Sequence, residues 1–247
     1  MKLFTSLCLV SLFLTGYSQA TDLNRIVGQK HSVYSVDLDS DISIILYEPD
    51  SIIPGEQVTP ILYIFGDFLF ETFSGSINYL LIELSLIPNC ILIGINEIPE
   101  KQIGHYQQEY STFIVNELMG KLSAKYNFTT KGILFGHSRA TRLVAQVIQE
   151  NPKYINQFIL SAPWFTEQHL NELDKSLSNK SEMISVYYTQ SKEDMARPAI
   201  QEANENFTDV LDKYQNVVRA KYQFFDDETH MSIPPLSFYY GVKYLLQ

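Results

Sequence analysis

A serine lies in a setting that could make it a nucleophile. Ser138 is the third residue of Gly136-His137-Ser138-Arg139-Ala140, which follows a short apolar run and precedes an amphipathic one. A serine on a sharp turn between a strand and a helix projects from the end of a sheet, and small neighbours leave room for its strained backbone. A serine that only caps a helix would give a similar pattern. The position of Ser138 between two such elements favours the nucleophile.

His230 is the histidine best placed to serve such a serine. A nucleophilic serine needs an imidazole that takes its proton and an acid that orients the imidazole. His230 follows the last predicted strand and precedes the closing helix, where a sheet with a serine turn carries its base. His137 lies inside the turn, and we expect its side chain to point away from Ser138. The other histidines, which read as surface residues or precede the first strand, are His31, His105 and His169.

Three carboxylates compete for the role of the orienting acid. The acid is expected after the strand predicted at Ile184–Thr189, and the loop there carries Glu193 and Asp194 side by side. Either could instead be a helix-entry charge, because a helix dipole stabilises carboxylates near its N-terminus. Glu228, shortly before His230, is the third candidate. The residue pattern alone leaves all three open.

Two backbone N–H groups are candidates for binding a developing oxyanion. Arg139, directly after the serine, would supply one from the start of the helix. The second is expected in the loop after the first parallel strand, Gly66-Asp67-Phe68, where Gly66 permits a tight turn and the N–H of Phe68 can face the serine. No pair of histidines, or of His and Asp, has the spacing of metal ligands on one face, so we expect neither a metal nor another cofactor.

These residues need a sheet and helices to position them, and the apolar pattern predicts both. Residues 33–48 alternate apolar and polar side chains around a turn, as an antiparallel hairpin does. Continuous apolar runs then alternate with helical spacing, which is typical of a parallel sheet covered on both faces. The predicted fold is α/β, with one domain over residues 21–247 and a doubly wound, mostly parallel sheet that begins with an antiparallel hairpin. The predicted strands are Val33–Leu38, Ile42–Glu48, Pro60–Phe65, Cys90–Ile95, Gly132–Phe135, Gln157–Ser161, Ile184–Thr189 and Ala220–Phe225, and the predicted helices are Phe73–Leu86, Gln107–Tyr126, Thr141–Glu150, Pro198–Tyr214 and Pro235–Leu246.

The composition agrees with a globular domain and excludes several classes of protein. The chain has 247 residues, of which 45% are hydrophobic and 19% charged, enough for one large core. A net charge of −10 disfavours binding to nucleic acid or to an anionic membrane surface. Two cysteines exclude a disulfide scaffold and a cysteine-rich zinc module.

Residues 1–20 have the pattern of a secretory signal peptide. Lys2 precedes an apolar run that is too short for a membrane span. The small residues Ser18 and Ala20 follow it at the spacing of a signal-peptidase site. We therefore expect cleavage near Ala20 and export of a mature chain without a membrane span, either to a periplasm or out of the cell.

Four stretches of the chain resemble the putative-esterase group of α/β-hydrolases, which includes enterochelin esterases, esterase D and feruloyl esterases. One follows the first parallel strand, one runs through the serine turn, one covers the acid loop and one contains His230. The last, with Glu-Thr-His at its start and a closing helix after it, is the most specific. The stretches are residues 60–72, 131–165, 186–195 and 228–246.

The resemblance implies an α/β-hydrolase fold and hydrolysis of an ester. Carried over by position, Ser138 is the nucleophile, His230 is the base, and Glu193 falls where the acid of the family lies, ahead of Asp194. The resemblance also implies that Asp67 and Trp164 lie near the substrate pocket.

The serine turn departs from the pattern of the family. G-H-S-x-G-G is usual there, whereas Ala140 and Thr141 replace both final glycines here, and Thr141 is bulky enough to crowd the helix against the strand. Residues and resemblance together predict a serine carboxylesterase that forms an acyl-enzyme and acts on a small-molecule or polysaccharide-linked ester. The alternative is a catalytically weak or inactive binding protein with the same fold. The sequence names neither the ester nor the oligomeric state.

Overall fold

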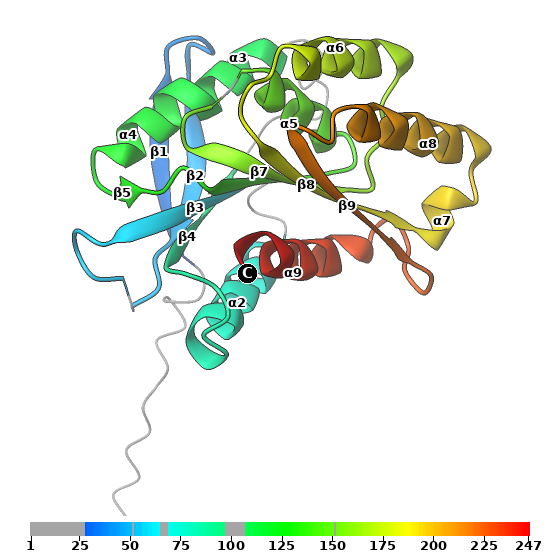
Figure 1. Cartoon of the computed structure of the whole chain (residues 1–247). Coiled ribbons are helices and arrows are strands. Elements are labelled where there is room, and N and C mark those ends of the chain that lie inside the picture. Colours follow the sequence, from blue (N-terminus) through cyan, green and yellow to red (C-terminus); the bar gives the residue numbers. More distant parts are fainter. Residues whose placement is uncertain (1–27, 51, 65–68, 97–106, 151) are drawn as a thin grey trace, which may run out of the picture.

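A mostly parallel sheet runs through the centre of the molecule (Figure 1). The computed structural model describes residues 28–50, 52–64, 69–96, 107–150 and 152–247, and within these ranges nine strands form the sheet. Their order is β1-β2-β4-β3-β6-β7-β8-β9, with β5 paired to β3 off this path. The strands are β1 (Gln29–Ser35), β2 (Ser40–Tyr47), β3 (Gln57–Ile64), β4 (Cys90–Ile95), β5 (Asn127–Phe128), β6 (Gly132–His137), β7 (Ile155–Ser161), β8 (Ile184–Ser191) and β9 (Val218–Phe225).

The first two strands form the antiparallel part of the sheet. β1 and β2 pair from Gln29 opposite Leu46 to Ser35 opposite Ser40, and β2 then pairs antiparallel with β4. In the turn between β1 and β2, Asp39 has a φ of 45°, a conformation that Asp tolerates better than most residues. The predicted hairpin and the predicted α/β fold are both confirmed.

The central strands are apolar along their length because helices cover them on both sides. Every residue of β4 is buried, and so is every residue of β3 after Gln57. Figure 1 shows α2 and α9 on one face and α3 to α6 with α8 on the other. Two buried clusters match these layers, one of which contains Phe73 and Phe238, and the other Phe113 and Phe207. The helices are α2 (Phe70–Asn78), α3 (Gln107–Thr112), α4 (Met119–Ser123), α5 (Ala140–Gln149), α6 (Glu167–Ser178), α7 (Lys192–Met195), α8 (Pro198–Lys213) and α9 (Ile233–Leu246).

Two predicted helices contain wider turns that the apolar spacing did not indicate. The π-helical segment η1 (Tyr79–Glu83) follows α2, and η2 (Phe113–Leu118) separates α3 from α4. The helix α6 was absent from the sequence-based prediction. None of the helices in the described ranges is both long and apolar enough to cross a membrane. The expected signal peptide, residues 1–20, lies outside the described residues.

The strand order determines where a site can form. β3 lies between β4 on one side and β6 on the other, so the chain changes its winding direction at β3. In open α/β sheets, ligands bind beyond the carboxyl ends of the strands at such a switch point. Ser138 directly follows the carboxyl end of β6.

Candidate active site

Ser138 occupies the sharp turn that the sequence predicted between β6 and α5. Its φ is 53°, a left-handed conformation that is uncommon for a residue with a Cβ, and its N–H donates to the carbonyl of Ser161 over 2.8 Å. Gly136 is required two residues earlier, on β6, because a Cβ there would lie 2.7 Å from Val144 Cγ2 and 2.9 Å from the Ala140 carbonyl oxygen. Strand and helix therefore approach closely around the partly buried, strained backbone of Ser138.

The two residues that replace the glycines of the family fit into this turn. Ala140 and Thr141 are both fully buried. The Thr141 hydroxyl donates to the carbonyl of Ser138 over 2.6 Å, so its added polar atom is paired. Thr141 thus ties the first turn of α5 to the serine backbone.

His230 connects Ser138 to a carboxylate. Its Nε2 lies 3.0 Å from Ser138 Oγ, and its Nδ1 lies 2.9 Å from Asp194 Oδ1. The three side chains come from different parts of the chain: the end of β6, the segment between β9 and α9, and the short helix α7. This is the arrangement in which a serine can transfer its proton to an oriented imidazole. The catalytic roles of the three residues stay predictions.

Asp194 is held in one orientation beneath the imidazole. Its side chain is 1% exposed, and its second oxygen, Oδ2, accepts from the Ser191 hydroxyl over 2.7 Å. Burial by itself raises the pKa of Asp194, but hydrogen bonds from His230 and Ser191 outweigh burial and hold the pKa below its usual value. The group is therefore a carboxylate at neutral pH.

Glu193, the acid that the resemblance favoured, does not contact the imidazole. Its Oε2 accepts from the backbone N–H of His230 over 3.0 Å, and its Oε1 pairs with Arg197 at 3.0 Å. Ser191 caps α7 and accepts from the N–H of Asp194, which fixes the rotation of that helical turn. Successive residues on a helix point in different directions, so only Asp194 faces the ring. The placement of Glu193 as the acid on the imidazole is corrected to Asp194.

The third candidate carboxylate stabilises the turn that carries His230. Glu228 accepts a hydrogen bond from the Ser232 hydroxyl, and the N–H of Thr229 donates to the same hydroxyl over 2.9 Å. Glu228 therefore holds the two sides of the histidine loop together and lies away from the Nδ1 contact, which Asp194 occupies.

His137 packs against the base, a contact that the sequence did not predict. Its ring lies 4.7 Å from that of His230, and its Nδ1 lies within 3.2 Å of both the carbonyl and the hydroxyl of Ser161. Burial, followed by the charge of His230, lowers the pKa of His137 to about 4, so this ring is neutral near pH 7. The Ser161 carbonyl near His137 Nδ1 also accepts the backbone N–H of Ser138, whereas no side-chain hydrogen bond joins the described His137 and Ser138. Ser161 continues into a buried hydroxyl chain through Ser237 to Thr189.

The remaining residues predicted for the site have different outcomes. Gly66, Asp67 and Phe68, the expected second oxyanion loop, and His105 lie outside the described residues. Arg139 is the N-cap of α5, as expected for the first oxyanion N–H. Trp164 follows β7 and is 49% exposed. His31 is exposed on β1, and His169 accepts from the N–H of Thr166 at the start of α6.

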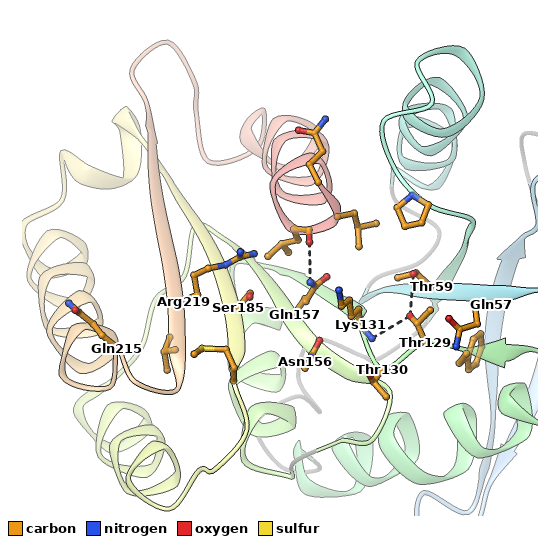
Figure 2. A pocket seen from close by; sticks show the side chains of 17 residues that line it. Gln57, Thr59, Thr129, Thr130, Lys131, Asn156, Gln157, Ser185, Gln215 and Arg219 are labelled. Atoms are coloured by element: carbon orange, nitrogen blue, oxygen red, sulfur yellow. Dashed lines mark hydrogen bonds between the residues drawn. The ribbon is translucent and has the colours of Figure 1, made fainter.

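Two hollows are lined by residues other than Ser138, His230 and Asp194. Figure 2 shows one of about 910 Å³ whose lining includes Lys131, Gln157 and Arg219, near the amino ends of β6, β7 and β9. It is therefore at the end of the sheet opposite Ser138. The other, of about 560 Å³, lies between α6 and α8 and is lined by Trp164 together with acidic side chains such as Glu202. Over the described ranges, no three His, Cys, Asp or Glu side chains converge as metal ligands would.

The fold is shared with several solved hydrolase structures. An IroE-like serine hydrolase from Shewanella oneidensis is similar over 88% of this chain and 79% of the hydrolase chain, with 15% identity and a TM-score of 0.77. The siderophore hydrolase EstA from Aspergillus nidulans matches over 88% and 93%, with 14% identity and a TM-score of 0.72. The enterobactin esterase FES from Shigella flexneri matches over 88% and 58%, with 14% identity and a TM-score of 0.69.

These similarities establish the α/β-hydrolase fold. No protein-family model and no curated protein matches the sequence. The resemblance to the putative-esterase group is thus confirmed at the level of the fold, and the activity has to be argued from the residues of the site.

Proposed function

We propose that this chain is a serine hydrolase that cleaves a carboxylic ester through an acyl-enzyme. One observation carries the proposal: His230 bridges Ser138 Oγ at 3.0 Å and Asp194 Oδ1 at 2.9 Å. A helix-capping serine would need neither contact. The strained backbone of Ser138 also supports it, because such strain persists where the surrounding structure enforces it, often at active sites.

In the acylation half of the reaction, Ser138 Oγ attacks the ester carbonyl carbon and His230 Nε2 takes the hydroxyl proton. The Asp194 carboxylate stabilises the imidazolium through Nδ1–H and keeps the tautomer that leaves Nε2 free to accept. The N–H of Arg139, with that of Phe68 as the second donor in the proposal, stabilises the oxyanion. The carbon–oxygen bond to the alcohol then breaks, and the imidazolium gives its proton to the leaving oxygen.

Deacylation repeats these steps with water. His230 takes a proton from a water molecule while the water oxygen attacks the acyl carbon. The imidazolium then returns that proton to Ser138 Oγ as the carboxylic acid leaves. The net reaction converts one ester and one water into one acid and one alcohol. No cofactor takes part in any step of the proposal.

The alternative of an inactive binding protein rested on the altered serine turn. Thr141 is buried and hydrogen-bonded to the serine carbonyl rather than forced outward, which supports a competent turn. Two proteins with a similar fold are a siderophore hydrolase and an enterobactin esterase, which favours a small-molecule ester as the substrate over a polysaccharide-linked one. Export after cleavage near Ala20 is part of the same proposal, because the N-terminal pattern is that of a signal peptide.

Hydrolysis of p-nitrophenyl acetate by the mature chain tests the proposal. We expect saturable release of p-nitrophenol and a loss of several orders of magnitude in kcat for Ser138→Ala and for His230→Ala. A matched control is Ser178→Ala, which removes an exposed hydroxyl at the end of α6 that bonds only to the nearby backbone carbonyl of Lys175. Equal turnover by the parent and Ser138→Ala would contradict the proposal.

A further inference from the structure

We propose that the hollow beside the end of α9, at the end of the sheet opposite Ser138, is a second ligand site that binds a polyhydroxylated carboxylate. The hollow has a volume of about 910 Å³, within the range of roughly 300–1,000 Å³ that small-molecule sites occupy. Residues of β3, β7, β8 and β9 line it, together with the end of α9 (Figure 2). None of the three residues proposed for catalysis lines it, so this inference stands apart from the hydrolase function.

A buried amide oxygen at this hollow has no donor among the described residues. Gln157 is 6% exposed, and its Nε2 donates to the carbonyl of Leu245 over 3.0 Å. That carbonyl lies in the last turn of α9, where carbonyls have no helical donor, and it can only face the NH₂ group of the amide. The orientation of the amide is therefore fixed, and Oε1 is an acceptor that no described group pairs.

A second unpaired acceptor comes from the neighbouring residue in the chain. Asn156 also lines the hollow, and its buried Oδ1 accepts no hydrogen bond within the described ranges. A buried amide oxygen that loses water without gaining a donor is destabilising, and native proteins leave few such groups unpaired. Two of them at one hollow indicate that hydroxyl or N–H donors of a ligand bind there.

Two cations at the hollow have no counter-ion among the described residues. Lys131 precedes β6 and Arg219 lies on β9, and neither forms an ion pair with a described carboxylate. The described residues that line the hollow include no Asp or Glu. In a chain with a net charge of −10, the hollow is therefore a local region of positive charge, which favours an anion over a neutral ligand.

The two cations approach the hollow from opposite sides. Three strand spacings separate β6 from β9, so the two backbones are about 14 Å apart. Figure 2 shows both side chains directed toward Gln157. The guanidinium carbon of Arg219 lies 5.2 Å from the centroid of the Tyr244 ring, and such stacking leaves the in-plane N–H donors free to bind a carboxylate. Lys131 is exposed, so it can swing toward an anion and open the way to the amide beside it.

These groups together define the chemistry of the ligand. A simple carboxylate would pair with the cations and leave both amide oxygens unpaired. A neutral polyol would do the reverse, and an amino acid would bring an ammonium group toward two like charges. A carboxylate with hydroxyl groups along its chain satisfies both sets, because its hydroxyls donate to the amide oxygens and its carboxylate accepts from Lys131 and Arg219.

Three six-carbon probes separate these requirements. Gluconate carries a carboxylate and hydroxyls, glucitol keeps the hydroxyls without the charge, and hexanoate keeps the charge without the hydroxyls. In calorimetric titrations of the full chain, we expect gluconate to bind at least about tenfold more tightly than either analogue, because only gluconate makes both kinds of contact. Added salt should weaken the binding of gluconate and leave that of glucitol unchanged. Equal affinity for all three probes would overturn the site.

Variants assign the preference to the hollow. Lys131→Gln and Arg219→Gln should each weaken gluconate binding about tenfold and leave the fold intact, since both side chains are exposed. Asn156→Ala should bring the affinity for gluconate toward that for hexanoate. The matched control is Lys175→Gln, which removes an exposed lysine on α6 and should bind gluconate as the parent does. An unchanged affinity in all three variants of the hollow would show that gluconate binds elsewhere and would overturn the site.

Two further titrations separate the site from the hydrolase function and identify the source of the acid. Ser138→Ala should bind gluconate as tightly as the parent, because the serine lies at the other end of the sheet. A loss of gluconate binding in Ser138→Ala would place the ligand at the serine and overturn the site. Trigalacturonate offers the same chemistry within a sugar-acid polymer. Binding tighter than that of gluconate would assign the site to a polymer, and weaker binding to a free acid; no binding of either compound would overturn the site.

Discussion

The side chain of Glu193 binds the backbone of His230: Oε2 of the glutamate accepts a hydrogen bond from the backbone N–H of the histidine over 3.0 Å. The neighbouring Asp194 holds the ring of the same histidine at 2.9 Å. Two adjacent carboxylates thus fix one residue in two different ways, and only one of them can affect the tautomer of the imidazole. This division of roles separates the effects of their amide variants.

Asp194→Asn should lower kcat by roughly 10⁴, as the loss of the orienting acid does in serine proteases, because the amide favours the wrong tautomer. Glu193→Gln is the matched control. It keeps an oxygen for the His230 N–H and loses an exposed pair with Arg197, for which a stability change of at most about 1 kcal/mol is expected. The steady-state kcat of both variants shows which carboxylate orients the imidazole. A larger loss of kcat in Glu193→Gln would contradict the assignment of Asp194.

His137 should make the protein less stable as the pH falls from 7. Its folded pKa is lowered from 6.5 to about 4, so between these values the unfolded chain binds a proton that the folded chain does not. The free energy of unfolding is then lost progressively as pH falls through this window, by about 2 kcal/mol at pH 5, and changes no further from this group below the folded pKa.

The comparison of parent and His137→Asn isolates this contribution. The amide can still donate to the Ser161 carbonyl but does not titrate, so urea unfolding at pH 7 and pH 5 should show a smaller loss in the variant. Identical losses in both proteins would mean that His137 takes up its proton in the folded state as readily as in the unfolded chain.

Thr141→Val should destabilise the protein by about 1 kcal/mol, because the methyl group fills the same space but cannot donate to the Ser138 carbonyl. Thr141→Gly should destabilise it further, since it also empties a fully buried volume. Thermal unfolding measures both effects. An increase of kcat in Thr141→Gly would show that the threonine does hold the turn open, as the departure from the family pattern first suggested.

Ser237→Ala should cost about 1–3 kcal/mol, because it leaves the buried hydroxyls of Ser161 and Thr189 without their shared neighbour. Ser237→Thr is the comparison variant: it keeps the hydroxyl and changes only the side-chain volume, by one methyl group. Urea unfolding of the two variants against the parent checks the effect, and a fully neutral Ser237→Ala would show that the chain contributes nothing to stability.

Much of this architecture is local and could be predicted from the sequence. The run Cys90–Ile95 was predicted with its observed bounds, because a continuous apolar stretch between polar segments has few other readings. Ser138 and His230 could be found because each lies at a junction of two recognisable elements. The π-helical segments could not, since apolar residues at helical spacing do not distinguish the two kinds of turn.

The choice between Glu193 and Asp194 depended on helix rotation, which composition does not give. Ser191 held a usable signal: a serine three residues before an acidic residue can cap the helix and fix the acid beneath it. The contacts of His137 with His230 and of Arg142 with Trp164 join residues distant in the chain. No spacing rule could have predicted them.

A fluorophosphonate probe tests the central claim most directly, because it reacts only with an activated serine. The parent protein is incubated with the probe, digested, and the modified peptide is identified by mass spectrometry, beside Ser138→Ala and Asp194→Asn. We predict one adduct per chain on Ser138, none in Ser138→Ala, and much slower labelling in Asp194→Asn. An unlabelled parent, or labelling that persists in Ser138→Ala, would contradict the account.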